Sequence, residues 1–420
     1  MSSELPVVAD PHPWRAAIWL GLLAIAGGMF VAIVVPVLRG RAGWWIPGDA
    51  WMSLRAAHYV PQGTYPLIYE TGTAHDVFDA GPLLPLVLAP VAAIGNLFRL
   101  QESYPFPRPY PDMWPVFGPY ALASGIPMLY AVRALATQLG VRRRRAILQM
   151  AVLVLAFVPM AIVYGHYEDV LALALVFLAF RDVFAERPLR GALLVGAAIL
   201  FKQWSVLVFP VFVAACPAPV RLRATLRCLL PPALFLSAFL AADYTYASAA
   251  LLHPSTFPLV GHAALWVSPT AAYLTNVPER PGAFVVALVV AWLVRRERDP
   301  AFIMSALGCV LLSRFLFESV VHAYYLAPGI AALLVSEWSR RRSIVTNFTL
   351  GAALLLAFPF HPARGLWWSV VYTLVALVLY RPVVQLVRRS KMGHDAVATA
   401  TTVRSAVFAG GAPASNAGTM

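Results

Sequence analysis

The chain has 420 residues, of which 60% are hydrophobic and 12% are charged, and it carries a formal net charge of +13. Soluble domains contain about 25% charged residues, so this composition excludes an ordinary soluble enzyme. The positive charge does not indicate nucleic-acid binding, because the arginines fall in short clusters between apolar runs, as in the cytoplasmic loops of membrane proteins. The three cysteines, Cys216, Cys228 and Cys309, lie in or beside apolar runs and indicate neither a disulfide framework nor a metal site.

Apolar runs long enough to cross a bilayer recur along residues 1–390 and predict an all-α, polytopic transmembrane bundle of about 11–12 membrane segments. The first run is too long for the core of a signal peptide. The composition of residues 391–420, rich in Ala, Thr, Ser and Gly, predicts a disordered cytoplasmic tail. The ordinary spans are expected at 16–38, 116–139, 146–163, 169–185, 229–248, 282–294, 301–318, 321–337, 344–359 and 366–387.

The arginine clusters predict which helix ends face the cytoplasm. Placing six clusters and four isolated basic residues inside puts 23 of the 32 basic residues in the cytoplasm. Two large extracytoplasmic regions follow from this threading, 39–114 and 249–281. Loops of this length tend to carry function. The six clusters lie at 142–145, 181–190, 221–227, 295–298, 340–342 and 388–391.

Two apolar stretches must then start and end on the same side. Residues 82–98 contain three prolines, and we expect a membrane-embedded or interfacial segment that returns to the outer face. The alternative is an ordinary crossing with a poor charge balance. Residues 191–216 have arginines at both ends and predict a hairpin of two short helices, with Lys202 near its apex. Half-length helices are tolerated where protein buries their ends.

Asp49 is the first carboxylate after the first span. Pro47-Gly48 favours a turn, so Asp49 could cap the helix that follows. It could equally serve as a general base at the bilayer surface, because a carboxylate accepts the proton of an attacking hydroxyl within hydrogen-bond reach. Both interpretations stay open.

Three further features carry charge beside apolar runs. Lys202 interrupts one such run. At the apex of the hairpin we expect it to present a cation to an outward-facing cavity, where it could bind a lipid-linked phosphate, or else to snorkel to the interface. Arg314, Glu318 and His322 are spaced to share a helix face, where Arg314 and His322 could bind phosphate. An Arg–Glu pair that serves stability is the alternative. The stretch "GHYED", 165–169, places His166, Glu168 and Asp169 on the same predicted face as Asp49.

The order and sidedness of these features resemble the GT-C superfamily of integral-membrane glycosyltransferases. The resemblance covers residues 15–340 and rests on Asp49 after the first helix, the long first outer loop, the "GHYED" turn and the "FKQW" hairpin. It is strongest to bacterial members that use polyprenyl-phosphate sugars, such as mannosyl- and arabinofuranosyltransferases. The motifs are short and degenerate.

The resemblance implies an inverting sugar transfer to a cell-envelope glycan or glycolipid on the extracytoplasmic face of the plasma membrane. It maps the general base onto Asp49 and the donor-phosphate contacts onto Lys202, Arg314 and His322. Some relatives use a divalent metal, but no DxD-type pair follows Asp49 here, so we expect no metal cofactor. A secondary transporter or a flippase of lipid-linked substrates remains the alternative. The candidates for acceptor or sugar binding are His166, Glu168, Asp169, Tyr65, Glu70, Gln203, Trp204 and Glu318.

Overall fold

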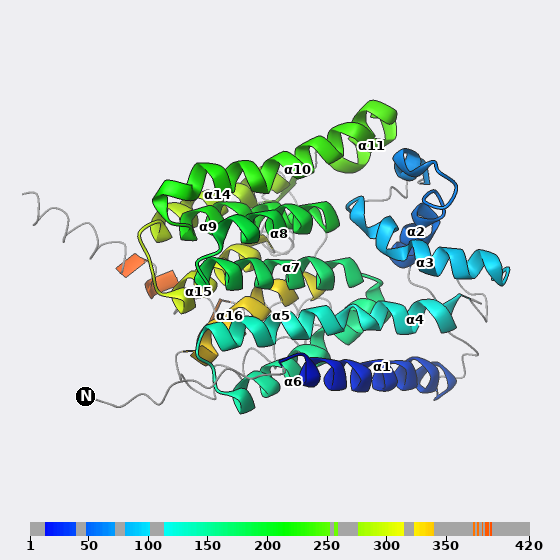
Figure 1. Cartoon of the computed structure of the whole chain (residues 1–420), viewed down its shortest axis with the longest axis horizontal. Helices are drawn as coiled ribbons and strands as arrows, with labels where there is room; N and C mark the ends of the chain where they lie inside the picture. The colour runs from blue at the N-terminus through cyan, green and yellow to red at the C-terminus, as the bar shows by residue number, and fades with distance from the viewer. Residues whose placement is uncertain are drawn as a thin grey trace, which may run out of the picture.

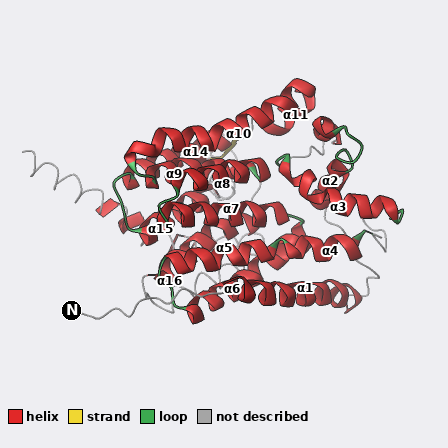
Figure 2. Ribbon diagram, in the orientation of Figure 1, coloured by secondary structure: helices red, strands yellow, loops and turns green. Residues whose placement is uncertain are grey.

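The structure is a computed structural model, and nearly all of its described part is helical (Figure 2). It describes residues 13–38, 48–71, 80–100, 113–252, 256–258, 276–314 and 323–339, with scattered residues between 373 and 388. The predicted spans 344–359 and 366–387, the predicted tail, Glu318 and His322 therefore lie outside the continuously described segments.

The α-helices and strands are α1 (Pro13–Leu38), α2 (Gly48–Ala57), α3 (Leu83–Leu97), α4 (Trp114–Ala123), α5 (Gly125–Gln138), α6 (Arg143–Pro159), α7 (Tyr167–Phe184), α8 (Pro188–Phe201), α9 (Val208–Ala215), α10 (Arg221–Ala242), α11 (Tyr244–Leu252), β1 (Thr256–Pro258), β2 (Asn276–Pro278), α14 (Glu279–Val294), α15 (Pro300–Ser313) and α16 (Ala327–Ser339). Short helical turns join them: η1 (Tyr65–Thr71), η2 (Met160–Tyr164), η3 (Gln203–Leu207), η4 (Ala218–Val220) and η6 (Ala323–Leu326).

Three helical stretches of the described part are long and apolar enough to cross a membrane: Trp14–Val34, Trp114–Gln138 and Ala218–Ala242. Large apolar side chains on the first and third of these are exposed, as expected of surfaces that face lipid. The predicted membrane character of the chain is therefore supported.

The long helices lie side by side, with α7 among them (Figure 1). Thirteen of the 18 residues of α7 are buried, which explains why its sequence is apolar on every side. Its neighbours α5 and α8 enclose it, and a helix so enclosed provides a rigid support for the residues at its ends.

Four of the six arginine clusters, at 142–145, 181–190, 221–227 and 295–298, lie in the described part and gather at one end of this bundle, here called the arginine end. Gln138 at the end of α5 donates a hydrogen bond to the carbonyl of Phe184 at the end of α7 (2.9 Å). Arg190 in the first turn of α8 pairs with Asp182 of α7 (3.1 Å). Arg221, the first residue of α10, donates to the carbonyl of Arg295 just after α14 (2.6 Å). The start of α7, the end of α8 and helix α2 lie at the opposite end, here called the Asp49 end (Figure 1).

The predicted hairpin at 191–216 is confirmed. Helix α8 ends at Phe201, Lys202 is extended, and η3 leads into α9. A Cβ atom added to Gly191, near the start of α8, would lie 3.1 Å from the ring of Phe212, near the end of α9. The two helices are therefore antiparallel. The start of α8 and the end of α9 both lie at the arginine end.

Helix α3, which covers most of 82–98, lies at one end of the bundle, while its return to the outer face of a membrane stays a prediction. Gly81, just before α3, donates a backbone hydrogen bond to the carbonyl of Phe201 (3.0 Å). Near the other end of α3, a Cβ atom added to Gly95 would lie 2.6 Å from the sulfur of Met113, which precedes α4. Both contacts lie at the Asp49 end, and α2 and α3 sit together there (Figure 1).

The predicted bounds of the span at 229–248 are wrong. The span expected at 229–248 begins at Arg221 as α10 and breaks at Asp243, where α11 starts. The arginines at 221–227 are helical because long basic side chains can place their charge at an interface while their stems stay on the helix. In the predicted loop 249–281, α11 continues to Leu252, and β1 pairs antiparallel with β2.

Candidate functional site

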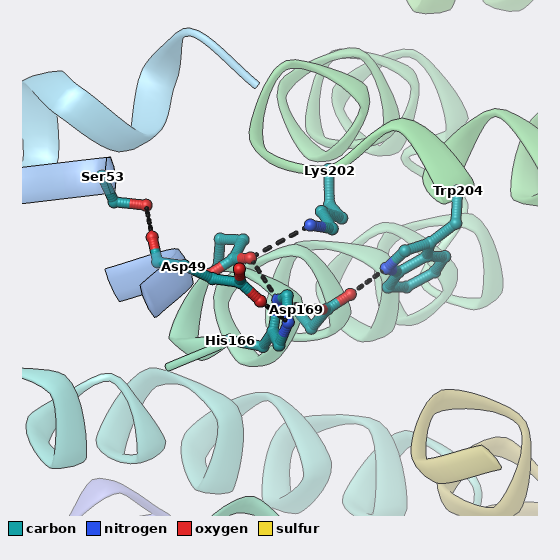
Figure 3. A network of polar contacts seen from close by, with 7 residues as sticks. Asp49, Ser53, His166, Asp169, Lys202 and Trp204 are labelled. Atoms are coloured by element: carbon teal, nitrogen blue, oxygen red, sulfur yellow. Dashed lines mark hydrogen bonds and ion pairs between the residues drawn. The ribbon is translucent and has the colours of Figure 1, made fainter. Parts of the chain in front are cut away.

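Three segments bring a cluster of charged side chains together at the Asp49 end (Figure 3). Asp49 lies in the first turn of α2, and His166 immediately precedes α7. Lys202 lies at the break between α8 and η3. We call Asp49, His166, Glu168, Asp169 and Lys202 the charged cluster. Sequence reasoning placed all five on one face, and the structure brings them into contact.

The chain enters α7 through a turn that fixes the direction of His166. Gly165 has a φ of +76°, a left-handed conformation that favours glycine. The amide of His166 then bonds back to the carbonyl of Met160 (2.9 Å). Glu168 and Asp169 follow in the first turn of α7, where negative charge is favoured by the helix dipole.

His166 bridges two carboxylates. Its Nε2 lies 2.8 Å from Oδ2 of Asp49, and its Nδ1 lies 2.8 Å from Oε1 of Glu168. The side chain is 4% exposed. Burial alone would lower the pKa of His166, but the Glu168 charge and the contacts with both carboxylates raise it to about 10. This environment favours the imidazolium form, whose Nδ1–H donates to Glu168.

Lys202 provides the second positive charge of the cluster. Its Nζ donates to Oε1 of Glu168 at 3.1 Å, so this one oxygen accepts from both Lys202 and His166. Lys202 is 7% exposed. Its ammonium group thus meets a buried carboxylate instead of the open cavity that we expected, while donor-phosphate binding by Lys202 stays a prediction.

Asp169 is held by the hairpin. The indole Nε1 of Trp204, in η3, donates a hydrogen bond to Oδ1 of Asp169 (Figure 3). Trp204 is buried, so its ring supports the cluster and is not displayed as an open platform for a sugar.

Asp49 is the accessible member of the charged cluster. Its side chain is 62% exposed, whereas those of His166, Glu168 and Asp169 are 2–4% exposed. Burial acts to raise the pKa of Asp49, but the contact with His166 and the charges of His166 and Lys202 lower it below its ordinary value. The carboxylate is therefore ionised and reachable. Its described partner is His166, so the cap interpretation of Asp49 is not supported.

Aromatic rings connect Arg314 to the cluster. The Tyr324 ring stacks on the His166 ring, with centroids 4.1 Å apart and planes at 27°. Tyr325 meets Tyr324 edge to face, and the Arg314 guanidinium lies 4.1 Å from the Tyr325 ring centroid. Sequence reasoning missed Tyr324, because nothing in the letters "HAYYL" marks one tyrosine as the neighbour of a distant histidine.

Three other predicted binding residues lie at the Asp49 end. Tyr65 packs against Phe235 and Phe239 and donates its hydroxyl to the carbonyl of Pro82. Glu70 lies in η1, but its side chain is outside the described part. Gln203 is the first residue of η3.

The donor groups of His166, Glu168 and Asp169 suit a divalent metal by type and spacing, since one ligand atom from each lies within 4.8 Å of the others. Both ring nitrogens of His166, however, already lie 2.8 Å from a carboxylate oxygen, Nε2 from Asp49 and Nδ1 from Glu168. Lys202 also occupies the Glu168 oxygen that His166 contacts. The cluster as it stands therefore does not fit a metal ion.

Comparison with known proteins adds no assignment to this site: neither a protein-family model nor a curated protein sequence matches the chain.

Proposed function

We propose that this chain is a multi-pass membrane glycosyltransferase of the GT-C type. It would move a sugar from a polyprenyl-phosphate donor to a cell-envelope glycan or glycolipid on the extracytoplasmic face, with inversion at the anomeric carbon. The placement of the arginine clusters and the charged cluster at opposite ends of the bundle supports this orientation, because arginine-rich loops stay in the cytoplasm.

The observation that carries the proposal is the position of Asp49. It is the exposed, ionised end of a buried charge network, and it lies where α2 and α3 cover the end of the bundle. A general base needs access to the substrate and an unprotonated oxygen, and Asp49 has both. His166 fixes the carboxylate from behind through Oδ2, so a substrate hydroxyl would approach from the exposed side.

In the proposed reaction, Asp49 takes the proton from the acceptor hydroxyl as its oxygen attacks the anomeric carbon. The bond from that carbon to the phosphate oxygen breaks, and polyprenyl phosphate leaves with the electron pair. Arg314, Lys202 and His322 are the proposed donor-phosphate contacts, since cations stabilise the charge that develops on a leaving phosphate. The proton stays on Asp49 until product release.

The predicted acceptor-binding residues that are buried have a supporting role in the proposed reaction. The described side-chain contacts of Glu168, Asp169 and Trp204 lie within the cluster, so we assign these residues to supporting His166 and Lys202. Tyr65, Glu70, Gln203 and Glu318 remain the candidates for contact with the sugar or acceptor.

Membranes that contain the wild type or Asp49→Asn, supplied separately with radiolabelled polyprenyl-phosphate mannose and the arabinofuranose donor, test this proposal. We expect the wild type to use one donor, and Asp49→Asn to lose at least about 100-fold in rate, because a positioned base contributes roughly 10²–10⁴-fold. Asp243→Asn is the matched control. Asp243 ends α10 at the same end of the bundle, and an amide there can still accept from Tyr246.

Each other result has a definite meaning. If Asp49→Asn accumulates normally and still transfers sugar, the base assignment is wrong. If the wild type uses neither donor, the proposed sugar classes are wrong and the transporter alternative gains support.

A further inference from the structure

We infer that Lys202 occupies the cation position of the charged cluster, so that this chain holds an ammonium group where the same carboxylates and imidazole would otherwise bind a divalent metal ion. The inference concerns cation binding and does not depend on the proposed sugar transfer. It predicts that replacing Lys202 with a neutral residue turns the cluster into a metal site.

The spacing of the ligands supports the first half of this inference. Nδ1 of His166 lies 2.8 Å from Oε1 of Glu168 and 3.5 Å from Oδ2 of Asp169. Ligands that share one small divalent ion lie about 2.0–2.2 Å from it and hence roughly 3 Å from each other. These three groups therefore need little movement to surround one ion.

The charges explain why Lys202 excludes that ion. Its Nζ lies 3.1 Å from Oε1 of Glu168, and its charge acts on Asp49 and Asp169 as well. Two like charges in a buried site repel strongly, so a metal ion would have to displace the ammonium group.

Loss of Lys202 would leave ligands available. In the described part, Oε2 of Glu168 and Oδ2 of Asp169 are buried and have no hydrogen-bond partner. Without Lys202, three carboxylates would face one imidazolium. This excess of negative charge favours a bound divalent cation.

The test titrates purified protein with Mn²⁺ and follows binding by electron paramagnetic resonance. The variants are Lys202→Met, Lys202→Arg and the double variant Lys202→Met with Glu168→Gln. We expect one Mn²⁺ per chain in Lys202→Met, bound at least tenfold more tightly than by wild type or Lys202→Arg. The double variant should lose this gain. Mn²⁺ should also raise the Tm of Lys202→Met and leave that of the wild type unchanged.

Two results would overturn the inference. One is a folded Lys202→Met protein that binds Mn²⁺ no better than the wild type. The other is a wild type that binds one Mn²⁺ per chain and loses it on Glu168→Gln, because the ion would then fit beside Lys202. The second comparison decides the question even if Lys202→Met does not fold. Sugar transfer is measured in neither, so failure here is distinct from failure of the proposed function.

Discussion

Replacing Glu168 by glutamine tests the charge network most directly. One oxygen of this carboxylate accepts from both His166 (2.8 Å) and Lys202 (3.1 Å), and the side chain is 3% exposed. The substitution preserves shape but leaves two buried cations with one carboxylate fewer. Removing one partner of a buried ion pair costs about 3–5 kcal/mol, because the remaining charge is uncompensated.

Thermal unfolding in a fixed detergent, followed by tryptophan fluorescence, measures this cost. A change of 1 kcal/mol shifts the Tm of a 150–250-residue domain by about 2–4 °C and shifts a longer chain less, so we expect Glu168→Gln to lose about 3–10 °C. Glu186→Gln is the matched control. Its side chain is exposed at the arginine end, and we expect an effect within about 0.5 kcal/mol.

The double variant Glu168→Gln with Lys202→Met supplies the decisive comparison. It removes both members of the pair, and neutral replacement of a buried ion pair often costs little. We therefore expect the double variant to be more stable than Glu168→Gln alone, which is a positive coupling in a double-mutant cycle. If the two losses simply add, Lys202 and Glu168 do not form an energetically coupled pair and the reasoning is refuted.

Two further predictions follow from the same cluster. The pKa of His166, raised to about 10, lies above its unfolded value of about 6.5, so its stabilising charge is fully present below pH 6.5 and is lost as the pH rises through 10. The stability gap between wild type and His166→Gln should therefore shrink by up to about 5 kcal/mol from pH 6 to pH 10.5 in denaturation curves, and a constant gap would contradict the assignment of the charge. Trp204→Phe should cost about 1.5–3 kcal/mol, because Asp169 loses a charged hydrogen bond, whereas Trp19→Phe on the exposed face of α1 should cost under about 0.5 kcal/mol.

The sequence was sufficient to predict the paths of the two unusual segments. Counting arginines required 191–216 to return to its starting side, and α8 and α9 form that hairpin in the structure. It also predicted that 82–98 returns to the outer face, and α3 lies at the Asp49 end of the bundle. The distribution of arginines along the chain predicts which end of each helix meets which face of the membrane. This prediction requires no knowledge of which helices are neighbours, so one sequence is enough to make it.

Lateral contacts could not be predicted in the same way. Lys202 was expected to face an open cavity, but it pairs with Glu168 because α8 packs directly on α7. Trp204 was expected at a sugar and instead binds Asp169. Tyr324 was not singled out at all. Such contacts depend on which helices are neighbours and on their rotation, and neither follows from hydropathy or from charge.

At Gly81 the backbone just before α3 packs directly against the backbone at the end of α8. The Gly81 amide bonds to the carbonyl of Phe201, and a Cβ at Gly81 would lie 2.0 Å from the carbonyl oxygen of Leu200, so no side chain cushions the two backbones. Lys202 is the next residue. A side chain at position 81 would therefore push apart the backbones of α3 and α8 directly beside the residue that pairs with Glu168.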